Sequence, residues 1–198
     1  ALIACCFTNL RRVSRASVHR KIALLYPFLK SELQLEWSAA NLEGIVDEFI
    51  DCLIKEAVLE PMGKNLRRPR RSHLAFIQLL RLAHIVQPIL ERYYMTFILL
   101  WQTSPTPMDE SQLEYRCHLL AQKISMIYGI NSPDFFDRLL FRDFIDTMVN
   151  SEYLLRDDKQ QLRFAPEFEY ISLDLRNLLS TEVRSSILSI VKNVPHQD

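Results

Sequence analysis

One long apolar helical stretch, residues 72–102, limits what this chain can fold into. Apolar residues recur there at intervals of three or four, which is the spacing of one face of an α-helix. The members of this stripe are Leu74, Ile77, Leu80 or Leu82, Ile85, Ile89, Tyr93 and Phe97. A second set widens the stripe almost to a full cylinder and consists of Leu79, Val86, Leu90, Tyr94, Ile98 and Trp101. A helix that is apolar on most of its circumference must be covered on most sides, so we expect other segments to pack on it from two directions.

Polar residues interrupt this stretch, and we do not expect it to span a membrane. The interrupting residues are Arg81, His84, Gln87, Glu91 and Arg92. No uninterrupted apolar run approaches the ~20 residues that a bilayer-spanning helix needs. Pro88 lies in the middle of the pattern and predicts a kink or a break near it, with the segment between Tyr94 and Phe97 as the other candidate.

The composition favours a mainly helical protein of one large domain or two small ones. The 198 residues include only three glycines, which disfavours sheets joined by tight turns. The first residue is Ala, inside the apolar run ALIACCF, so we interpret the chain as a fragment of a longer polypeptide without a signal peptide. Cys5, Cys6, Cys52 and Cys117 lack metal-ligand spacing and are predicted to be small core residues, with no metal and no cofactor.

The net charge is zero, but it is unevenly spread along the chain. Residues 1–75 carry a balance of +4, residues 76–102 carry +1 and residues 103–198 carry −5. Residues 11–30 hold six basic side chains and no acidic one, which suits either a solvated helix face or a contact with an anionic surface.

The remaining sequence predicts helices separated by short connectors and two β-hairpins. Residues 1–9 resemble the tail of a buried helix, and residues 11–16 are predicted to be a polar connector. Further helices are expected over 18–34 with Ser17 as cap, 40–57, 110–128 with Asp109 or Ser111 as cap, 134–150 and 170–191. For the helix over 40–57 we predict an inward face of Leu42, Ile45, Phe49, Leu53 and Ile54. The hairpins are expected over 57–71 and 153–164, a linker over 103–107 and a helix break over 129–133.

An offset of 95 residues relates the two halves of the chain. The tripeptide Phe49-Ile50-Asp51 recurs as Phe144-Ile145-Asp146, and Leu24-Leu25 falls on Leu119-Leu120. Each half then shows helices followed by a hairpin and another helix, the order of a winged helix. The fold prediction is therefore mainly α: two winged-helix-like helical units with short β-hairpins, over 1–94 and 95–198, joined by a long central helix.

A winged helix invites a DNA-binding hypothesis, but the charges argue against it. The expected reading helix over 40–57 carries five acidic residues and one basic one, and the net charge of zero lacks a basic footprint. We therefore expect no nucleic acid. The basic run Arg67, Arg68, Arg70 and Arg71 is the candidate contact with an anionic membrane or a neighbouring domain.

No motif for catalysis is visible in the sequence. It contains no G-x-S-x-G, no glycine-rich phosphate loop and no H-E-x-x-H. His84 is predicted to be a core or interfacial histidine, and His73 a residue at the start of a helix.

Three stretches together resemble a known family. They are YPFLKSEL at Tyr26–Leu33 followed by Trp37, LERYY at Leu90–Tyr94, and YGINSPDFFD at Tyr128–Asp137. In this order and spacing they resemble the C-terminal region of the membrane-bound glycerol-3-phosphate acyltransferases of bacteria, which are related to the mitochondrial enzyme. The resemblance covers nearly the whole chain, most clearly residues 20–185.

The resemblance implies a parent enzyme that transfers a fatty acyl group from acyl-CoA or acyl carrier protein to sn-glycerol 3-phosphate in phospholipid synthesis. That family works at the cytoplasmic face of the inner membrane and uses an H-x-x-x-x-D motif, which this chain lacks. No catalytic, cofactor or metal residue can therefore be assigned. We expect a non-catalytic C-terminal accessory domain, peripheral to the membrane, that packs on the upstream acyltransferase domain or helps to seat the enzyme on an anionic membrane. The alternative is a tandem winged-helix module that binds proteins or nucleic acid.

Overall fold

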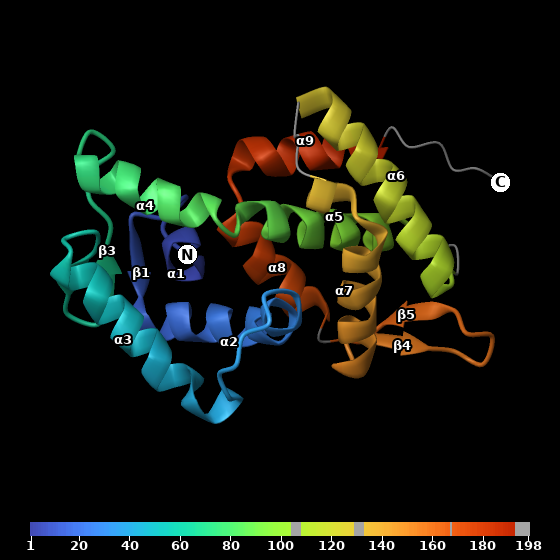
Figure 1. The fold of residues 1–198 in the computed structure, drawn as a ribbon, viewed down its shortest axis with the longest axis horizontal. Helices are drawn as coiled ribbons and strands as arrows, with labels where there is room; N and C mark the ends of the chain where they lie inside the picture. Colours follow the sequence, from blue (N-terminus) through green and yellow to red (C-terminus); the bar gives the residue numbers. More distant parts are fainter. Residues whose placement is uncertain (104–107, 129–132, 167, 193–198) are drawn as a thin grey trace. The chain divides into compact units, whose positions relative to one another are not determined.

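The computed structural model describes residues 1–103, 108–128, 133–166 and 168–192, and it divides the chain into two compact units. The first unit contains residues 1–88 and 177–180, and the second contains residues 89–176 and 181–198 (Figure 1). The predicted unit boundary lies between residues 94 and 95, and the predicted linker over 103–107 and break over 129–133 lie mostly outside the described residues. The mainly α prediction is confirmed, because helices make up most of both units and the strands are short.

The first unit combines helices with a three-stranded antiparallel sheet. Its elements in chain order are α1 (Leu2–Cys5), β1 (Arg12–Ser14), α2 (Arg15–Glu32), a 3₁₀ turn (Ala39–Asn41), α3 (Leu42–Lys55), β2 (Glu60–Met62), β3 (Asn65–Arg67) and α4 (Leu74–His84). The strand order is β1-β3-β2, so the first strand pairs with the far arm of the hairpin. The predicted hairpin is confirmed, and Gly63 accommodates its turn with a φ of +61°.

Strand β1 replaces the polar connector that we predicted over residues 11–16. Val13 is buried and pairs with Leu66, while Arg12 is exposed. A single inward side chain is too little for the period-2 pattern that signals a strand, so the sequence did not predict it. Ser14 then caps α2 by accepting a hydrogen bond from the Ser17 amide at 3.1 Å, and the helix begins at Arg15 rather than at residue 18.

Helix α3 buries a different face from the predicted one. Leu42, Val46 and Ile50 are buried, so of the predicted set only Leu42 is fully inside. Phe49 is 48% exposed, and its ring lies 5.8 Å from that of Trp37. The helix carries apolar residues on two adjacent stripes, and periodicity alone does not tell which of them faces the core.

The second unit contains helices and a two-stranded antiparallel hairpin. Its elements are α5 (Gln87–Thr103), α6 (Glu110–Tyr128), a 3₁₀ turn (Pro133–Phe136), α7 (Arg138–Asn150), β4 (Leu154–Arg156), β5 (Leu162–Phe164), most of α8 (Phe168–Leu178) and α9 (Thr181–Lys192). The predicted second hairpin and the predicted bounds of the helix over 110–128 are confirmed.

The last predicted helix, over 170–191, is in fact two helices, α8 and α9. The chain leaves α8 near Leu179, where Asn9 donates its amide to the carbonyls of Asn177 at 3.1 Å and Leu179 at 2.6 Å. These carbonyls would otherwise lack partners at the end of a helix. The cap comes from a residue about 170 positions away, so no local signal predicted the break.

The long stretch over 72–102 is broken into α4 and α5 at Ile85–Val86. The predicted break is confirmed near Pro88, which lies in the first turn of α5, where a proline costs the helix no hydrogen bond. Helix α5 runs unbroken past Tyr94 and Phe97. No single helix in the described ranges is long and apolar enough to cross a membrane; α4 and α5 meet that criterion only as a bent pair.

The two halves of this stretch differ in how they are covered. In α5, the side chains from Arg92 to Phe97 are all buried, so the expectation of a helix covered on most sides is confirmed there. In α4, the buried face consists of Ala75, Phe76, Leu79 and Ala83. The expectation of a helix covered on most sides is wrong for α4, because Leu74 and Ile77 are exposed, as is Ile85 just after it.

The 95-residue offset found in the sequence also relates the observed elements. Adding 95 to the bounds of α2, α3 and α4 gives 110–127, 137–150 and 169–179, against observed helices over 110–128, 138–150 and 168–178. Val13 of β1 corresponds to Met108, whose carbonyl accepts a hydrogen bond from the Leu162 amide of β5 at 2.8 Å. The two units therefore share one element order, and the assignment of each to the winged-helix class stays a prediction.

Replacing Leu90 by Asp should lower the free energy of unfolding by roughly 3–5 kcal/mol, because it places an unpaired charge on a fully buried face of α5. Ile85→Asp is the matched control, since Ile85 is 66% exposed and its replacement should cost little. Chemical denaturation of both variants measures the difference. Equal stability of the two variants would show that α5 is not the core of its unit.

Candidate functional site

The structure distributes the four predicted arginines over different environments. Arg70 and Arg71 are exposed, and Arg67 at the end of β3 forms an ion pair with Glu60 of β2. Arg68 is only 6% exposed. The predicted anionic contact is therefore available at two of the four positions, while a third is neutralised and the fourth points inward.

Arg68 has no acidic partner in the described part of the chain. Its guanidinium lies 4.6 Å from the ring centre of Phe76, and Nη1 donates to the carbonyl of Pro69 at 3.1 Å, while Nε is buried without a hydrogen-bond partner. Burial lowers the pKa of Arg68, and the nearby charges of Arg71 and Arg11 lower it further. The surroundings of Arg68 are thus strongly electropositive.

Two further arginines join this surface through β1. Arg12 pairs with Arg67 across the sheet, and the carbonyl of Arg11 accepts the Arg68 amide at 3.0 Å. Both side chains are exposed and make no ion pair among the described residues. We did not include them in the predicted site, because only the pairing of β1 with β3 brings them beside the arginine run. We call Arg11, Arg12, Arg70 and Arg71 the arginine surface.

The acidic face of α3 is partly neutralised inside the first unit. Arg15 donates to Asp47 at 2.7 Å and to Asp51 at 2.9 Å, and His19 Nε2 lies 2.9 Å from Asp47. The side-chain hydrogen bond from Arg15 lowers the pKa of Asp47 against the opposing effect of burial. These carboxylates hold α2 and α3 together, and they leave the expected reading helix without a basic surface for nucleic acid.

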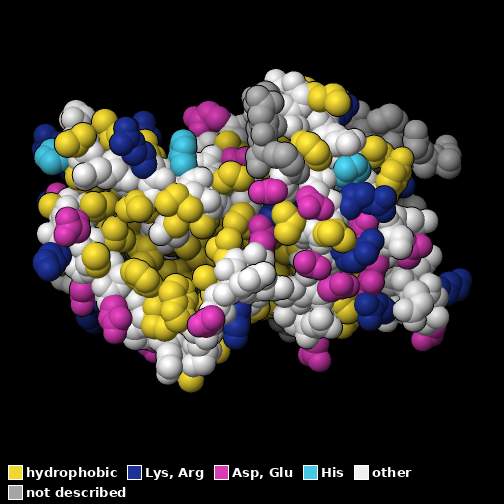
Figure 2. Space-filling view, in the orientation of Figure 1, with side chains coloured by type: hydrophobic (Ala, Val, Ile, Leu, Met, Phe, Trp, Pro, Cys, Tyr) yellow, Lys and Arg dark blue, Asp and Glu magenta, His cyan; other side chains and the backbone are white. Residues whose placement is uncertain are grey.

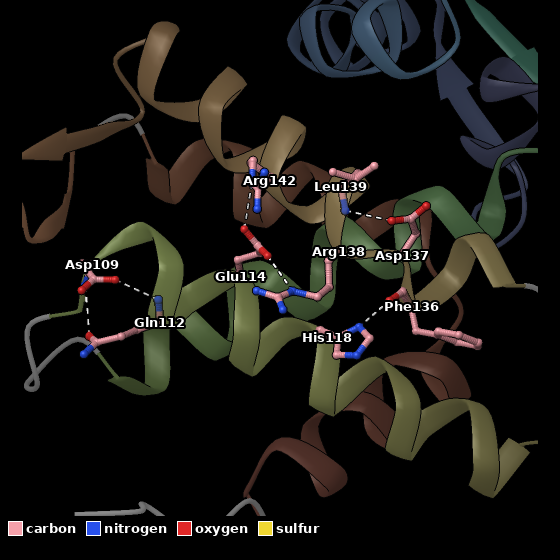
Figure 3. Close-up of polar contacts among 9 residues, drawn as sticks. All are labelled: Asp109, Gln112, Glu114, His118, Phe136, Asp137, Arg138, Leu139 and Arg142. Carbon is pink, nitrogen blue, oxygen red and sulfur yellow. Dashed lines mark hydrogen bonds and ion pairs between the residues drawn. The ribbon is translucent and has the colours of Figure 1, made fainter.

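A second polar cluster lies in the second unit, between α6 and α7 (Figure 3). Glu114 accepts from Arg138 Nε at 2.7 Å and from Arg142 Nε at 2.9 Å. Burial acts to raise the pKa of Glu114, but the hydrogen bonds from Arg142 and Arg138 outweigh it, and the pKa is lowered. The cluster was not predicted, because its members come from two helices whose contact the sequence does not specify.

The flanks of this cluster fix the ends of the two helices. Asp109 caps α6, accepting from the Gln112 amide at 2.8 Å, which selects Asp109 over Ser111 as the predicted cap. His118 Nδ1 donates to the carbonyl of Phe136 at 2.6 Å. All these groups have partners that explain them as links between elements, and they do not form an arrangement for acid–base chemistry.

The histidines and cysteines correct two expectations. His84 is exposed at the end of α4 rather than in a core, whereas His73 caps that helix as predicted. Cys52 is exposed, while the other three cysteines are buried as expected. Burial raises the pKa of Cys5 and of Cys117 to about 12, so these thiols are unreactive. Within the described residues, no group of His, Cys, Asp or Glu could hold a metal ion.

The sequence matches the family described as the glycerol-3-phosphate acyltransferase C-terminal region over residues 1–157, and the chain belongs to this family. It is 31% identical over its full length to the glycerol-3-phosphate acyltransferase of Pseudomonas paraeruginosa strain PA7, of which it covers 24%. It is 32% identical over 96% of its length to that of Pseudomonas fluorescens strain SBW25, of which it covers 23%. The chain thus spans about a quarter of these relatives. No solved structure matches it.

Replacing Glu114 by Gln should destabilise the chain by about 1–2 kcal/mol at pH 7, because two charge-assisted hydrogen bonds weaken while the arginines remain half exposed. The folded-state pKa of Glu114 is lowered, so its contribution exists above the unfolded-state pKa and is lost as the pH falls. The difference from the unmutated chain should therefore shrink below about pH 4.

Thermal unfolding of Glu114→Gln at a series of pH values measures this effect. Glu48→Gln, at an exposed position of α3, is the control and should show no such dependence. A destabilisation of Glu114→Gln that persisted unchanged at acid pH would contradict the role of its charge.

Proposed function

We propose that this chain is the non-catalytic C-terminal domain of a glycerol-3-phosphate 1-O-acyltransferase. The parent enzyme would transfer a fatty acyl group from acyl-CoA or acyl carrier protein to sn-glycerol 3-phosphate. The observation that carries this proposal is the family match together with relatives of about four times the length of this chain, all named as that enzyme.

The chemistry is proposed to reside upstream in the parent polypeptide. The acyltransferase family that the sequence resembles uses a histidine as general base. An aspartate five positions after this histidine orients it. In this chain the residues five positions after the first four histidines are Leu24, Gln78, Ile89 and Lys123, and the fifth histidine, His196, is followed by two residues in the sequence. No histidine of these 198 residues is followed by an aspartate at that spacing.

An exposed apolar surface on the first unit supports packing against the upstream part of the parent. Figure 2 shows hydrophobic side chains gathered around a hollow between α4 and α3, over the place of α1 in Figure 1. The exposed large apolar side chains of α4 are Leu74 and Ile77, Ile85 follows directly after the helix, and α3 carries the exposed Phe49. Contiguous apolar patches on a folded domain mark interaction surfaces.

The arginine surface supports a contact with anionic lipid at the cytoplasmic face of the inner membrane. Its four guanidinium groups are exposed and have no ion pairs among the described residues. Each basic residue near an anionic membrane contributes about 1 kcal/mol of attraction. Acyl carrier protein is acidic, so in this proposal it approaches the basic arginine surface rather than the acidic second half of the chain.

The alternative of a module that binds nucleic acid is not favoured by the family match. The sequence also allowed a module that binds other proteins. In this proposal the protein surface that the chain binds belongs to the upstream part of the same polypeptide.

The 198-residue chain should show no acyl transfer to glycerol 3-phosphate with either acyl-CoA or acyl carrier protein as donor, because it lacks the histidine–aspartate dyad. A radiometric assay for lysophosphatidic acid tests this, with the full parent polypeptide as the positive control. Product formed by the chain alone would contradict the proposed division of labour. An inactive parent would contradict the assignment of the enzyme itself.

The chain should float with vesicles that contain anionic lipid and should lose this binding when Arg70 and Arg71 are both changed to Glu. Arg163→Glu is the matched control in the other hairpin, since Arg163 is already paired with Asp157. Binding should fall as salt rises, because the contact is between exposed charges.

Two outcomes of the flotation would overturn the proposed contact. The first is binding that survives the double reversal. The second is binding to neutral vesicles that Phe49→Asp abolishes, which would place the apolar hollow, rather than the arginine surface, against lipid.

A further inference from the structure

The repeated tripeptide Phe-Ile-Asp has different surroundings in the two units. In the second unit Phe144 is 3% exposed, with its ring stacked on Tyr93 at 4.0 Å and an interplanar angle of 5°. Phe97 adds an edge-on contact at 5.6 Å. In the first unit Phe49 is 48% exposed, and its ring centre lies 5.8 Å from that of Trp37. The same sequence on equivalent helices is covered in one unit and open in the other.

The difference lies in the first helix of each unit. Phe144 is covered from α5, which has 17 residues, whereas the helix at the equivalent place in the first unit is α1, which has four. With the offset of 95, Phe97 corresponds to Leu2, so the position of Tyr93 corresponds to the third residue upstream of Ala1. The first nine residues of α5, Gln87–Met95, have their counterparts upstream of Ala1.

The open surface lies where such a helix would run. In Figure 1 the N-terminus is marked between α4 and α2, and Figure 2 shows the apolar hollow at the same place. Helix α1 begins at Leu2, and its N-cap residue Ala1 makes no side-chain hydrogen bond to the first amides of the helix. The matched relatives extend far beyond the length of this chain, and the match is to their C-terminal region, so polypeptide precedes this position in them.

We propose that the apolar hollow of the first unit is the docking site for the segment directly upstream of Ala1 in the parent polypeptide. This segment continues α1 as a helix for about two and a half turns, the length of nine residues at 3.6 per turn. Its third residue before Ala1 is large and apolar, and covers Phe49 as Tyr93 covers Phe144. The proposal rests on the proposed function only in requiring a longer parent.

The chemistry of the hollow defines the occupant. Figure 2 shows it bordered by hydrophobic side chains, and the two helices beside it carry exposed large apolar side chains, Leu74 and Ile77 on α4 and Phe49 on α3. A helix that packs against these side chains buries one apolar stripe of its own surface. Its opposite face stays polar or contacts the catalytic part of the parent. Its continuity with α1 makes the contact intramolecular, so it forms at a high effective concentration.

The test compares the 198-residue chain with a chain lengthened by its nine natural upstream residues. Trp37 and Trp101 are the two tryptophans of the sequence, so Trp101→Phe in both chains leaves Trp37 as a reporter beside Phe49. In the lengthened chain, Trp37 emission should shift to shorter wavelength, its quenching by acrylamide should fall, and the melting temperature should rise. Alanine at the third residue upstream of Ala1 should reverse these changes.

A matched pair of phenylalanine variants provides the control. Phe49→Ala should cost little in the 198-residue chain and clearly more in the lengthened one, while Phe144→Ala should cost the same in both. Hydrogen exchange of α3 in the intact parent, with and without Phe49→Ala, gives the same comparison if the lengthened chain is poorly soluble.

Three results would overturn the proposal. They are unchanged quenching of Trp37 on lengthening, an effect of Phe49→Ala that is equal in both chains, and a dimer of the 198-residue chain that Phe49→Asp dissociates, since the occupant would then be a second copy. None of them bears on acyltransferase activity. An inactive parent whose Trp37 is protected would, conversely, retain the docked helix and reject the enzyme assignment.

Discussion

The stack of Tyr93 on Phe144 is the contact on which the second unit depends. It joins α5 to α7 through two rings at 4.0 Å, and Phe97 of α5 adds an edge-on contact with Phe144 at 5.6 Å. Stacked and edge-on rings add about 0.5–1.5 kcal/mol each beyond the area that they bury. Because α5 is buried around its circumference from Arg92 to Phe97, the remaining helices of the unit are arranged around it. Even Arg92 is drawn inward, and its Nη1 donates to the carbonyl of Asp134 at 2.8 Å.

The sequence predicted most of the helices, both hairpins and the internal repeat, because amphipathic spacing and turn residues are local signals. It did not predict β1, because this strand has one inward residue, Val13, and only its pairing with Leu66 in the fold identifies it as part of a strand. It did not predict the break after α8, because the capping amide of Asn9 comes from the other end of the chain. It also assigned α3 the wrong inward face and expected α4 to be covered on most sides, since each helix carries apolar residues on more of its surface than the unit covers. These errors share one cause, which is that contact between distant segments decides them.

The candidate site was predictable in composition but not in geometry. The arginine run was visible as a cluster of charge, yet Glu60 neutralises Arg67 and the fold buries Arg68 against Phe76. The remaining arginine surface consists of Arg11 and Arg12 at the start of β1 and Arg70 and Arg71 in the segment after β3. Such a surface acts on partners by charge, and it lacks the paired acid and base that a reaction centre needs. The family to which the chain belongs is described as the C-terminal region of glycerol-3-phosphate acyltransferase, and the matched relatives are about four times as long as the chain.

The uncovered side of α4 and the exposed Phe49 have one explanation. A repeat that buries Phe144 with the first half of α5 leaves Phe49 open wherever the equivalent half helix is missing. The exposed apolar residues of α3 and α4 then form a face of the core that a further segment of the polypeptide would bury. Sequence periodicity predicted that Phe49 faces inward and that the stretch over 72–102 is covered on most sides, and the structure shows Phe49, Leu74 and Ile77 exposed. Both observations hold if the core of the first unit is completed by polypeptide that precedes it, as the core of the second unit is completed by α5.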